Sequence, residues 1–321
     1  MKNCLSTLIL AIVLICGTIS IPQNLSANED VGTTGFNFLR VIYSARATAL
    51  GNAYTAMSDD TDAVFFNPAG LPNARSKGIA TTYMNYFEGF QGGSVVYISP
   101  SQERLSFGIF AQYLGNQSIT RTMVDEQGEY MGTAGTFGAN DIVVGFASGY
   151  YIHEFLNLGA SIRYISESLE DYSASAAVID LGVLHQTMNE NLKVGVTLKN
   201  VGTQITYYTA TKYREKMPTQ VTVGFNYRFH EKFVGNLDIL KPLDNDFSGR
   251  IGLEYRLHPI LTLRTGFDTR TDDWKMGGDY DFFSGLSGGF GINYNNYELN
   301  YGITSYGDLG LVNQITLKYL F

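Results

Sequence analysis

The chain has 321 residues, is rich in glycine, tyrosine and phenylalanine, and carries a formal net charge of −8. This length supplies one large domain, and the composition favours strands and turns over helices. The negative charge argues against nucleic acid as a partner.

The first residues have the pattern of an export signal. Lys2 precedes an apolar stretch over residues 5–21, and small residues follow it. This pattern predicts a signal peptide over residues 1–27, with a retained membrane anchor as the alternative. Because Cys4 and Cys16 both lie in this region, the mature protein is expected to fold without disulfides.

Residues 28–76 differ from the rest of the chain. Ser44 precedes an Ala-rich run and is a candidate N-cap of a short helix, and residues 67–72 begin with the turn-forming pair Asn67 and Pro68. The segment is too short to form an independent domain. It is either a periplasmic lead-in to the main domain or a plug inside it.

From about residue 77, apolar and polar residues alternate in runs that are separated by polar or glycine-containing turns. Many of these runs have the length that a tilted strand needs to cross a bilayer. Glycines within strands, as at 288–291, indicate bends or close backbone packing. We predict fourteen strands, with approximate spans 77–87, 91–99, 104–114, 141–151, 156–167, 177–187, 192–200, 219–229, 232–240, 247–257, 260–269, 287–295, 296–304 and 312–321.

The connections between these strands alternate in length. Every second join is tight, as at 230–231, 258–259 and 295–296. Most of the joins between them are longer, as at 115–140 and 201–218, and the exceptions are the short joins at 88–90 and 241–246. This asymmetry and an alternating run that ends on Phe321 are typical of outer-membrane barrels, in which short turns face the periplasm. We therefore predict an all-β membrane protein, an antiparallel transmembrane β-barrel over residues 77–321, in a bacterial outer membrane with both termini periplasmic. A soluble β-sandwich or propeller is the alternative.

The segment before the barrel resembles a known family. Residues 44–56 read Ser-Ala-Arg-Ala-Thr-Ala-Leu-Gly-Asn-Ala-Tyr-Thr-Ala, Asp59 and Asp60 follow, and residues 63–71 read Ala-Val-Phe-Phe-Asn-Pro-Ala-Gly-Leu. This stretch is similar to the N-terminal signature of the PorV/PorQ family. That family is itself similar to the FadL-type long-chain fatty acid transporters of the outer membrane.

The resemblance implies a fourteen-stranded barrel whose segment 28–76 folds inward as a hatch. It leaves two functions open: a passive conduit for hydrophobic or amphipathic small molecules such as long-chain fatty acids, or a type IX secretion component that docks cargo proteins. Outer-membrane lipids are expected partners in both cases. The hatch residues are expected to be Ser44, Arg46, Asp59, Asp60, Asn67, Pro68, Ala69 and Gly70.

If the apolar face of each strand points outward, the inward face carries more basic than acidic side chains. Such an interior favours an anionic headgroup such as a carboxylate. The alternative is that these charges pair with one another and with the hatch. The predicted lumen-lining residues are Arg104, Arg163, Lys193, Arg228, Arg250, Glu254, Arg256, Arg264 and Glu298, and Asp180, Asp268 and Lys318 share their face.

Residues 115–140 are predicted to form a solvated outer loop. Loops of this kind often carry binding function. The apolar residues Met123, Tyr130, Met131 and Phe137 are candidate contacts for a hydrophobic ligand, or they pack the loop onto itself.

No catalytic constellation stands out, so an enzyme is not expected and no cofactor is implied. Three of the four histidines fall in predicted turns, and none has metal-ligand spacing. Asp59, Asp60 and Asp62 crowd three carboxylates into four positions, but their spacing does not match an EF-hand. We predict a capping or solvated turn there and no metal site.

Overall fold

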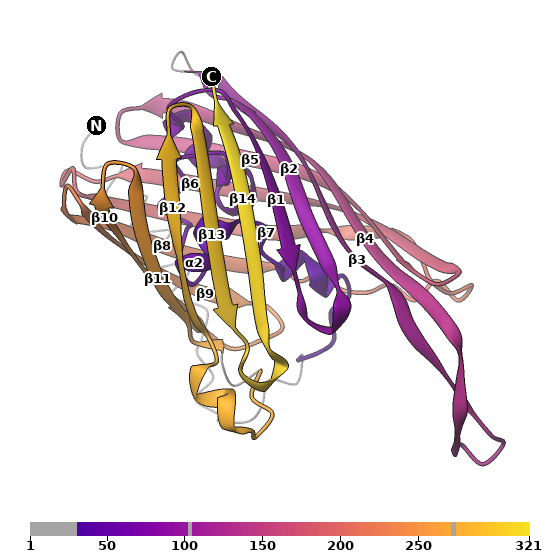
Figure 1. Cartoon of the computed structure of the whole chain (residues 1–321). Coiled ribbons are helices and arrows are strands. Elements are labelled where there is room, and N and C mark those ends of the chain that lie inside the picture. Colours follow the sequence, from indigo (N-terminus) through magenta and orange to yellow (C-terminus); the bar gives the residue numbers. More distant parts are fainter. Residues whose placement is uncertain (1–30, 102–104, 271–273) are drawn as a thin grey trace.

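The computed structural model describes residues 31–101, 105–270 and 274–321, so the predicted signal peptide lies outside the described part. Fourteen strands of this part form one closed antiparallel barrel (Figure 1). The predicted fold class is therefore confirmed. The strands are β1 (Gly78–Asn85), β2 (Gln91–Ser99), β3 (Leu105–Val124), β4 (Tyr130–His153), β5 (Leu156–Leu169), β6 (Tyr172–Gln186), β7 (Leu192–Thr206), β8 (Gln220–His230), β9 (Phe233–Pro242), β10 (Ser248–His258), β11 (Leu261–Asp268), β12 (Leu286–Tyr294), β13 (Tyr297–Ser305) and β14 (Leu311–Leu320).

The first and last strands close the barrel. Gly78 pairs with Leu320, and Asn85 at the other end of β1 pairs with Asn313. The other edge of β1 pairs with β2 along the whole strand. Closure of this kind satisfies the backbone hydrogen bonds of a sheet without exposing an edge, which a lipid environment requires.

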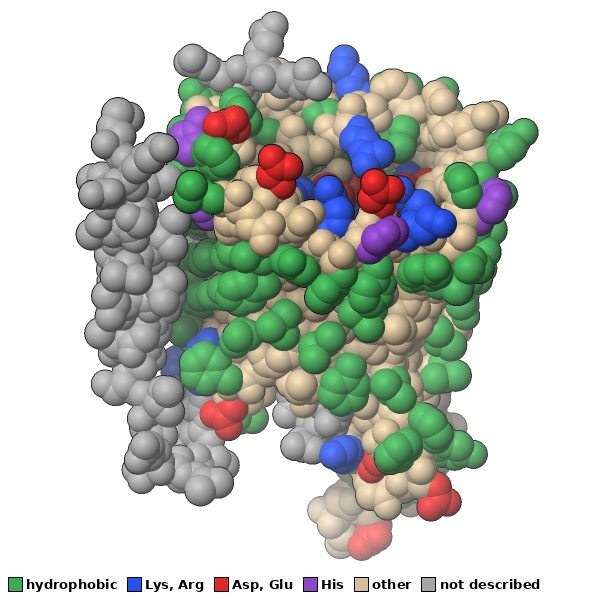
Figure 2. Space-filling model, turned by 90° about the vertical axis from the view of Figure 1, so that its left-hand side faces the viewer, with side chains coloured by type: hydrophobic (Ala, Val, Ile, Leu, Met, Phe, Trp, Pro, Cys, Tyr) green, Lys and Arg blue, Asp and Glu red, His purple; other side chains and the backbone are tan. Residues whose placement is uncertain are grey.

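Side chains alternate between the two sides of the barrel wall, because successive residues of a strand point to opposite faces. In β10, Arg250 and Gly252 are buried, whereas Ile251 and Leu253 are exposed on the outside. Figure 2 shows hydrophobic side chains gathered across the middle of the visible face, with charged and histidine side chains above them. An apolar belt between polar ends is typical of a barrel that faces lipid.

The two ends of the barrel differ. At the short-turn end, strands are joined by tight connections such as 231–232, 259–260 and 295–296. At the opposite, long-loop end, the connections include 207–219 and 269–285. Within the described residues, three short helices also lie in the long-loop connections: η3 (Phe87–Gly89), η5 (Asp279–Phe283) and η6 (Gly307–Leu309).

The prediction of an outer loop over residues 115–140 is wrong. β3 continues to Val124 and β4 begins at Tyr130, so only a short turn remains, and this hairpin projects beyond the neighbouring strands (Figure 1). The stretch is rich in threonine, which favours strands, but neither of its faces is buried and its polarity therefore indicated a loop. The connection predicted at 168–176 likewise shortens to residues 170–171.

The N-terminal segment, residues 31–76, occupies the inside of the barrel, where Figure 1 shows its short helices within the ring of strands. Its helix α2 contacts β11 to β14, and η2 contacts β3 to β6. No helix of the described residues is long and apolar enough to cross a membrane. The helices of the segment are η1 (Asn37–Arg40), α2 (Ala45–Ala49), α3 (Ala63–Phe66) and η2 (Pro68–Asn73).

The N-terminal segment begins at the long-loop end. Thr34 forms a β-bridge with Lys216, and Arg40 pairs with Asp244, and both partners lie in long-loop connections. Phe321 lies at the other end, beyond β14. The start of the chain lies outside the described residues, so the predicted periplasmic position of both termini stays a prediction.

Candidate functional site

Ten inward-facing glycines let the N-terminal segment lie close against the barrel wall. A methyl group at Gly266 would lie 2.1 Å from the Gly51 nitrogen, and one at Gly159 would lie 2.1 Å from the Ala69 nitrogen. Only a residue without a Cβ lets the two backbones approach so closely. We call these residues the glycine seat: Gly108, Gly149, Gly159, Gly182, Gly195, Gly224, Gly252, Gly266, Gly289 and Gly302.

Ser44 and Asn67 fix the local shape of the segment. Ser44 is the N-cap of α2: its Oγ accepts a hydrogen bond from the Ala47 nitrogen and donates to Asp62 at 2.6 Å. Asn67 accepts from the Ala69 nitrogen, and its amide donates to the Val183 carbonyl of β6. Each side chain therefore shapes the segment and ties it to a neighbour.

The residues after Asn67 lie against the wall at the glycine seat. Pro68, Ala69 and Gly70 are buried, and the Pro68 carbonyl faces Gly149 of β4. The turn Asn67-Pro68-Ala69 is thus held between β4, β5 and β6. All the residues predicted for the hatch lie inside the barrel, which is a necessary condition for such a role.

Arg46 is the centre of an ionic network between the segment and the wall. Its guanidinium lies 2.9 Å from Asp60 and 3.1 Å from Asp59, and it also pairs with Glu254 of β10 at 3.2 Å. Lys318 of β14 extends the network, because its Nζ lies 2.6 Å from Asp60 and 2.9 Å from Asp62. The network therefore connects the N-terminal segment to two strands far apart in sequence.

The charge of Asp60 in this network is stable near neutral pH. Burial alone would raise the pKa of Asp60, but Lys318 and Arg46 hold that pKa well below its usual range. Since the pKa is lower in the folded than in the unfolded chain, the ionised Asp60 contributes stability above its ordinary pKa near 4. This contribution is lost only as the pH falls through the lower folded value.

Most of the other predicted lumen charges are paired. Arg163 donates to Asp180 at 2.6 Å, and Arg250 donates to Asp268 at 2.9 Å. Arg264 bonds Glu254 and Asn300, and Asn300 bonds Glu298. These contacts agree with the alternative in which the interior charges neutralise one another.

The remaining predicted lumen residues are less enclosed. Lys193 is half-buried on the inward face of β7, and Arg228 and Arg256 are exposed near the short-turn end. Arg104 lies outside the described residues.

Two residues that we did not single out also hold the segment. Lys199 of β7 donates to the Phe65 carbonyl at 2.6 Å, and the buried Asp238 of β9 accepts from the Tyr54 and Thr55 nitrogens. Lys199 lies an even number of residues after Lys193 and therefore on the same face of the strand. Asp238 interrupts an apolar strand. The alternation of side chains could therefore have identified both residues.

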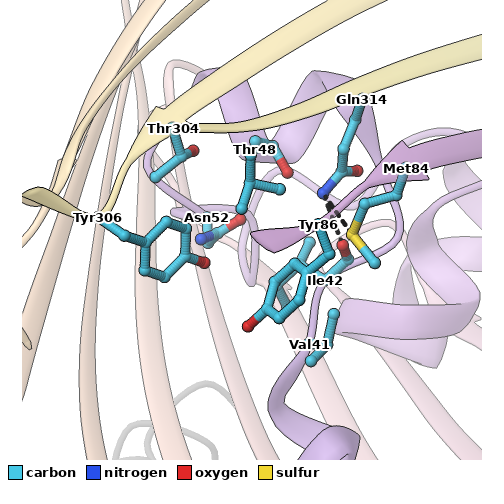
Figure 3. A pocket seen from close by; sticks show the side chains of 10 residues that line it. Val41, Ile42, Thr48, Asn52, Met84, Tyr86, Thr304, Tyr306 and Gln314 are labelled. Carbon is cyan, nitrogen blue, oxygen red and sulfur yellow. Dashed lines mark hydrogen bonds between the residues drawn. The ribbon is translucent and has the colours of Figure 1, made fainter. Parts of the chain in front are cut away.

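A small polar hollow lies between the segment and the wall on the long-loop side. Figure 3 shows its lining from the segment, from β1 and its end, from β13 and its end, and from β14, with Gln314 bonded to the Ile42 carbonyl and to the Met84 sulfur. It has room for about one water molecule. Its lining is Val41, Ile42, Thr48, Asn52, Met84, Tyr86, Thr304, Tyr306, Val312 and Gln314.

Aromatic rings border this hollow at the long-loop end. The Tyr86 ring packs against the Phe87 ring, and the Tyr306 ring contacts both. The ring centroids of Tyr306 and Trp274 lie 4.5 Å apart. Burial raises the pKa of the Tyr86 and Tyr306 hydroxyls, so both stay neutral hydrogen-bonding groups at physiological pH.

The four predicted outer-loop contacts lie on the projecting hairpin. Met123, Tyr130 and Met131 are exposed at its tip, and the half-buried Phe137 pairs across the hairpin with Ile119. They line neither this hollow nor a second one that Leu39, Arg40 and Lys199 border. Their role as ligand contacts stays a prediction. The described residues contain no cluster of three or more His, Cys, Asp or Glu that could hold a metal ion.

Comparison with known proteins places the fold. No protein-family model matches the chain, and no curated protein matches it. Among solved structures, the toluene transporter TodX of Pseudomonas putida is similar, with a TM-score of 0.61, 14% identity, and coverage of 86% of this chain and 96% of that one. The toluene transporter TbuX of Ralstonia pickettii has a TM-score of 0.58, 15% identity, and coverage of 87% and 98%. A FadL homologue of Pseudomonas aeruginosa has a TM-score of 0.56, 11% identity, and coverage of 88% and 99%.

At these identities the likeness concerns the fold. The FadL-like barrel implied by the sequence resemblance is confirmed as an architecture. The narrower assignment to the PorV/PorQ family receives no support from these comparisons.

Proposed function

We propose that the protein is a passive channel for hydrophobic small molecules in a bacterial outer membrane, with residues 31–76 as its hatch. The main support is a FadL-type barrel whose lumen is filled by a segment seated on the wall. TodX and TbuX, which share the fold, are described as toluene transporters. The apolar belt supports the membrane position, and in this proposal the short-turn end faces the periplasm.

The paired interior charges bear on the kind of molecule that is carried. A carboxylate needs a cation to offset its desolvation. Arg163, Arg250 and Arg264 already bind carboxylates of the barrel. We therefore favour uncharged molecules over an anionic headgroup for this channel.

The alternatives have less support. Docking of cargo in type IX secretion, which the resemblance to the PorV/PorQ family implies, stays a prediction because no observation on the barrel favours it. An enzymatic role is not proposed, since the solved structures with this fold are described as transporters and channels.

The proposal is tested by permeability of the outer membrane in whole cells. Cells that produce the protein should take up the neutral hydrophobic dye N-phenyl-1-naphthylamine several times faster than cells with an empty vector. The hydrophilic substrate nitrocefin, cleaved by a periplasmic β-lactamase, should enter at an unchanged rate because the hatch fills the lumen. Equal dye uptake in the two strains would contradict the channel, and faster nitrocefin entry would indicate a general pore instead.

A further inference from the structure

The polar hollow of Figure 3 contains more hydrogen-bonding capacity than its neighbours use. Four of its lining atoms have no hydrogen-bond partner among the described residues: Thr48 Oγ1, Asn52 Oδ1, Thr304 Oγ1 and Gln314 Oε1. These side chains are only 3 to 6% exposed. Buried polar groups are normally bonded, so four open groups around one space indicate a partner that enters it.

The four groups come from different parts of the fold. Thr48 and Asn52 belong to the N-terminal segment, Thr304 to β13 and Gln314 to β14. The segment therefore completes the hollow, which would not exist on the barrel wall alone. A molecule bound here contacts the proposed hatch and the wall together.

The chemistry of the lining selects an uncharged group. None of the ten lining residues is charged. The positive charge of Arg270 opposes the rise in the pKa of Tyr86 and Tyr306, but its guanidinium is already paired with Asp268. A carboxylate in the hollow would lose its hydration without gaining a cation, whereas a hydroxyl would gain donors and acceptors.

The remaining lining is apolar and adaptable. Val41, Ile42 and Val312 provide aliphatic surface, and Met84 is an unbranched side chain that adjusts to irregular shapes. As it stands, the hollow has room for about one water molecule, so it accommodates a polar group and leaves the rest of a molecule among the border aromatics.

We propose that this hollow binds the hydroxyl of a small neutral molecule whose remainder is apolar, so that the channel selects alcohols over hydrocarbons and carboxylates of the same size. This inference rests on the proposed function and narrows its substrate class. The site is the seam between the N-terminal segment and strands β1, β13 and β14.

Binding can be followed on the purified full-length mature protein. Trp274 is the one tryptophan of the chain and contacts Tyr306, so its fluorescence reports on the border of the hollow. The probes are cyclohexanol, methylcyclohexane and cyclohexanecarboxylate, which match in size and do not absorb at the excitation wavelength. Cyclohexanol should bind at least about fivefold more tightly than methylcyclohexane, and the carboxylate should bind most weakly.

Isosteric variants locate the site. Thr48→Val and Thr304→Val each remove one open hydroxyl. Each should weaken the binding of cyclohexanol about fivefold and leave the affinity for methylcyclohexane unchanged. Thr197→Val is the matched control, because Thr197 on β7 is equally buried and its hydroxyl also has no hydrogen-bond partner among the described residues, but it does not line the hollow. Equilibrium dialysis with radiolabelled probes measures the same affinities if Trp274 does not respond.

The outcomes separate this inference from the channel itself. Equal affinities for the three probes, or an alcohol affinity that Thr48→Val and Thr304→Val do not change, would overturn the binding site and leave only water in the hollow. Dye uptake by whole cells would then still support the channel. Selective alcohol binding without dye uptake would support the site and contradict the channel.

Discussion

Replacing Lys318 with Met is expected to destabilise the protein by about 3–5 kcal/mol, because it leaves the buried carboxylate of Asp62 without its cation. Lys318 is fully buried, and its Nζ contacts Asp60 and Asp62 of the N-terminal segment. Met has a similar volume, so the loss comes from charge more than from packing. The measurement is guanidinium unfolding of the protein in detergent, followed by the strand signal in circular dichroism.

A second substitution separates charge from shape. Asp60 keeps Arg46 when Lys318 is lost, but within the described residues Lys318 is the one cation within ion-pair distance of Asp62. The double variant Lys318→Met with Asp62→Asn should therefore recover a large part of the stability.

The matched control is Lys193→Met, an inward-facing and half-buried lysine on β7 without an ion pair in the described part of the chain. It should change the unfolding free energy by less than about 0.5 kcal/mol. A Lys318→Met variant as stable as this control would show that the network does not hold the segment.

The strands could be located from the sequence because two environments act on opposite faces of each one. Where the outside meets lipid and the inside is polar, alternation is strict, and the strand predicted at 91–99 is β2, Gln91–Ser99. The error at 115–140 has a related physical cause. There the hairpin leaves the barrel, both faces are exposed, and no alternation distinguishes a strand from a loop.

The alternation of side chains along each strand predicted that these charges point inward. It could not predict which groups they pair with. Arg46 and Glu254 are separated by 208 residues, and their contact depends on the path of a segment that has no periodicity. The glycines were a partial signal. At 288–291, the sequence indicated close packing, and the structure places Gly289 against Ala49 while a methyl group at Gly288 would meet only ordinary contacts.

Methyl groups are expected to act very differently at tightly packed and at open glycines of the barrel wall. Gly252 and Gly266 pair across β10 and β11, and methyl groups there would lie 2.5 Å from the Leu50 carbonyl and 2.1 Å from the Gly51 nitrogen. Overpacking of this kind costs about 1–3 kcal/mol at each site. Since each clash is with the backbone of the segment and not with the strand pair itself, we expect the double variant Gly252→Ala with Gly266→Ala to displace the segment while the barrel still closes.

Ion conductance in planar bilayers shows whether the segment has left the lumen of a closed barrel. The unmodified protein should show no steady current because its lumen is filled, whereas the double variant should open a measurable conductance. The control is Gly249→Ala with Gly288→Ala, where the nearest atoms to the new methyl groups lie 3.7 Å and 3.8 Å away. It should remain closed and equally folded. The double variant Gly252→Ala with Gly266→Ala could instead show no conductance while its strand content is intact. That result would mean that the segment adjusts without leaving the lumen, and that the glycine seat does not keep the channel shut.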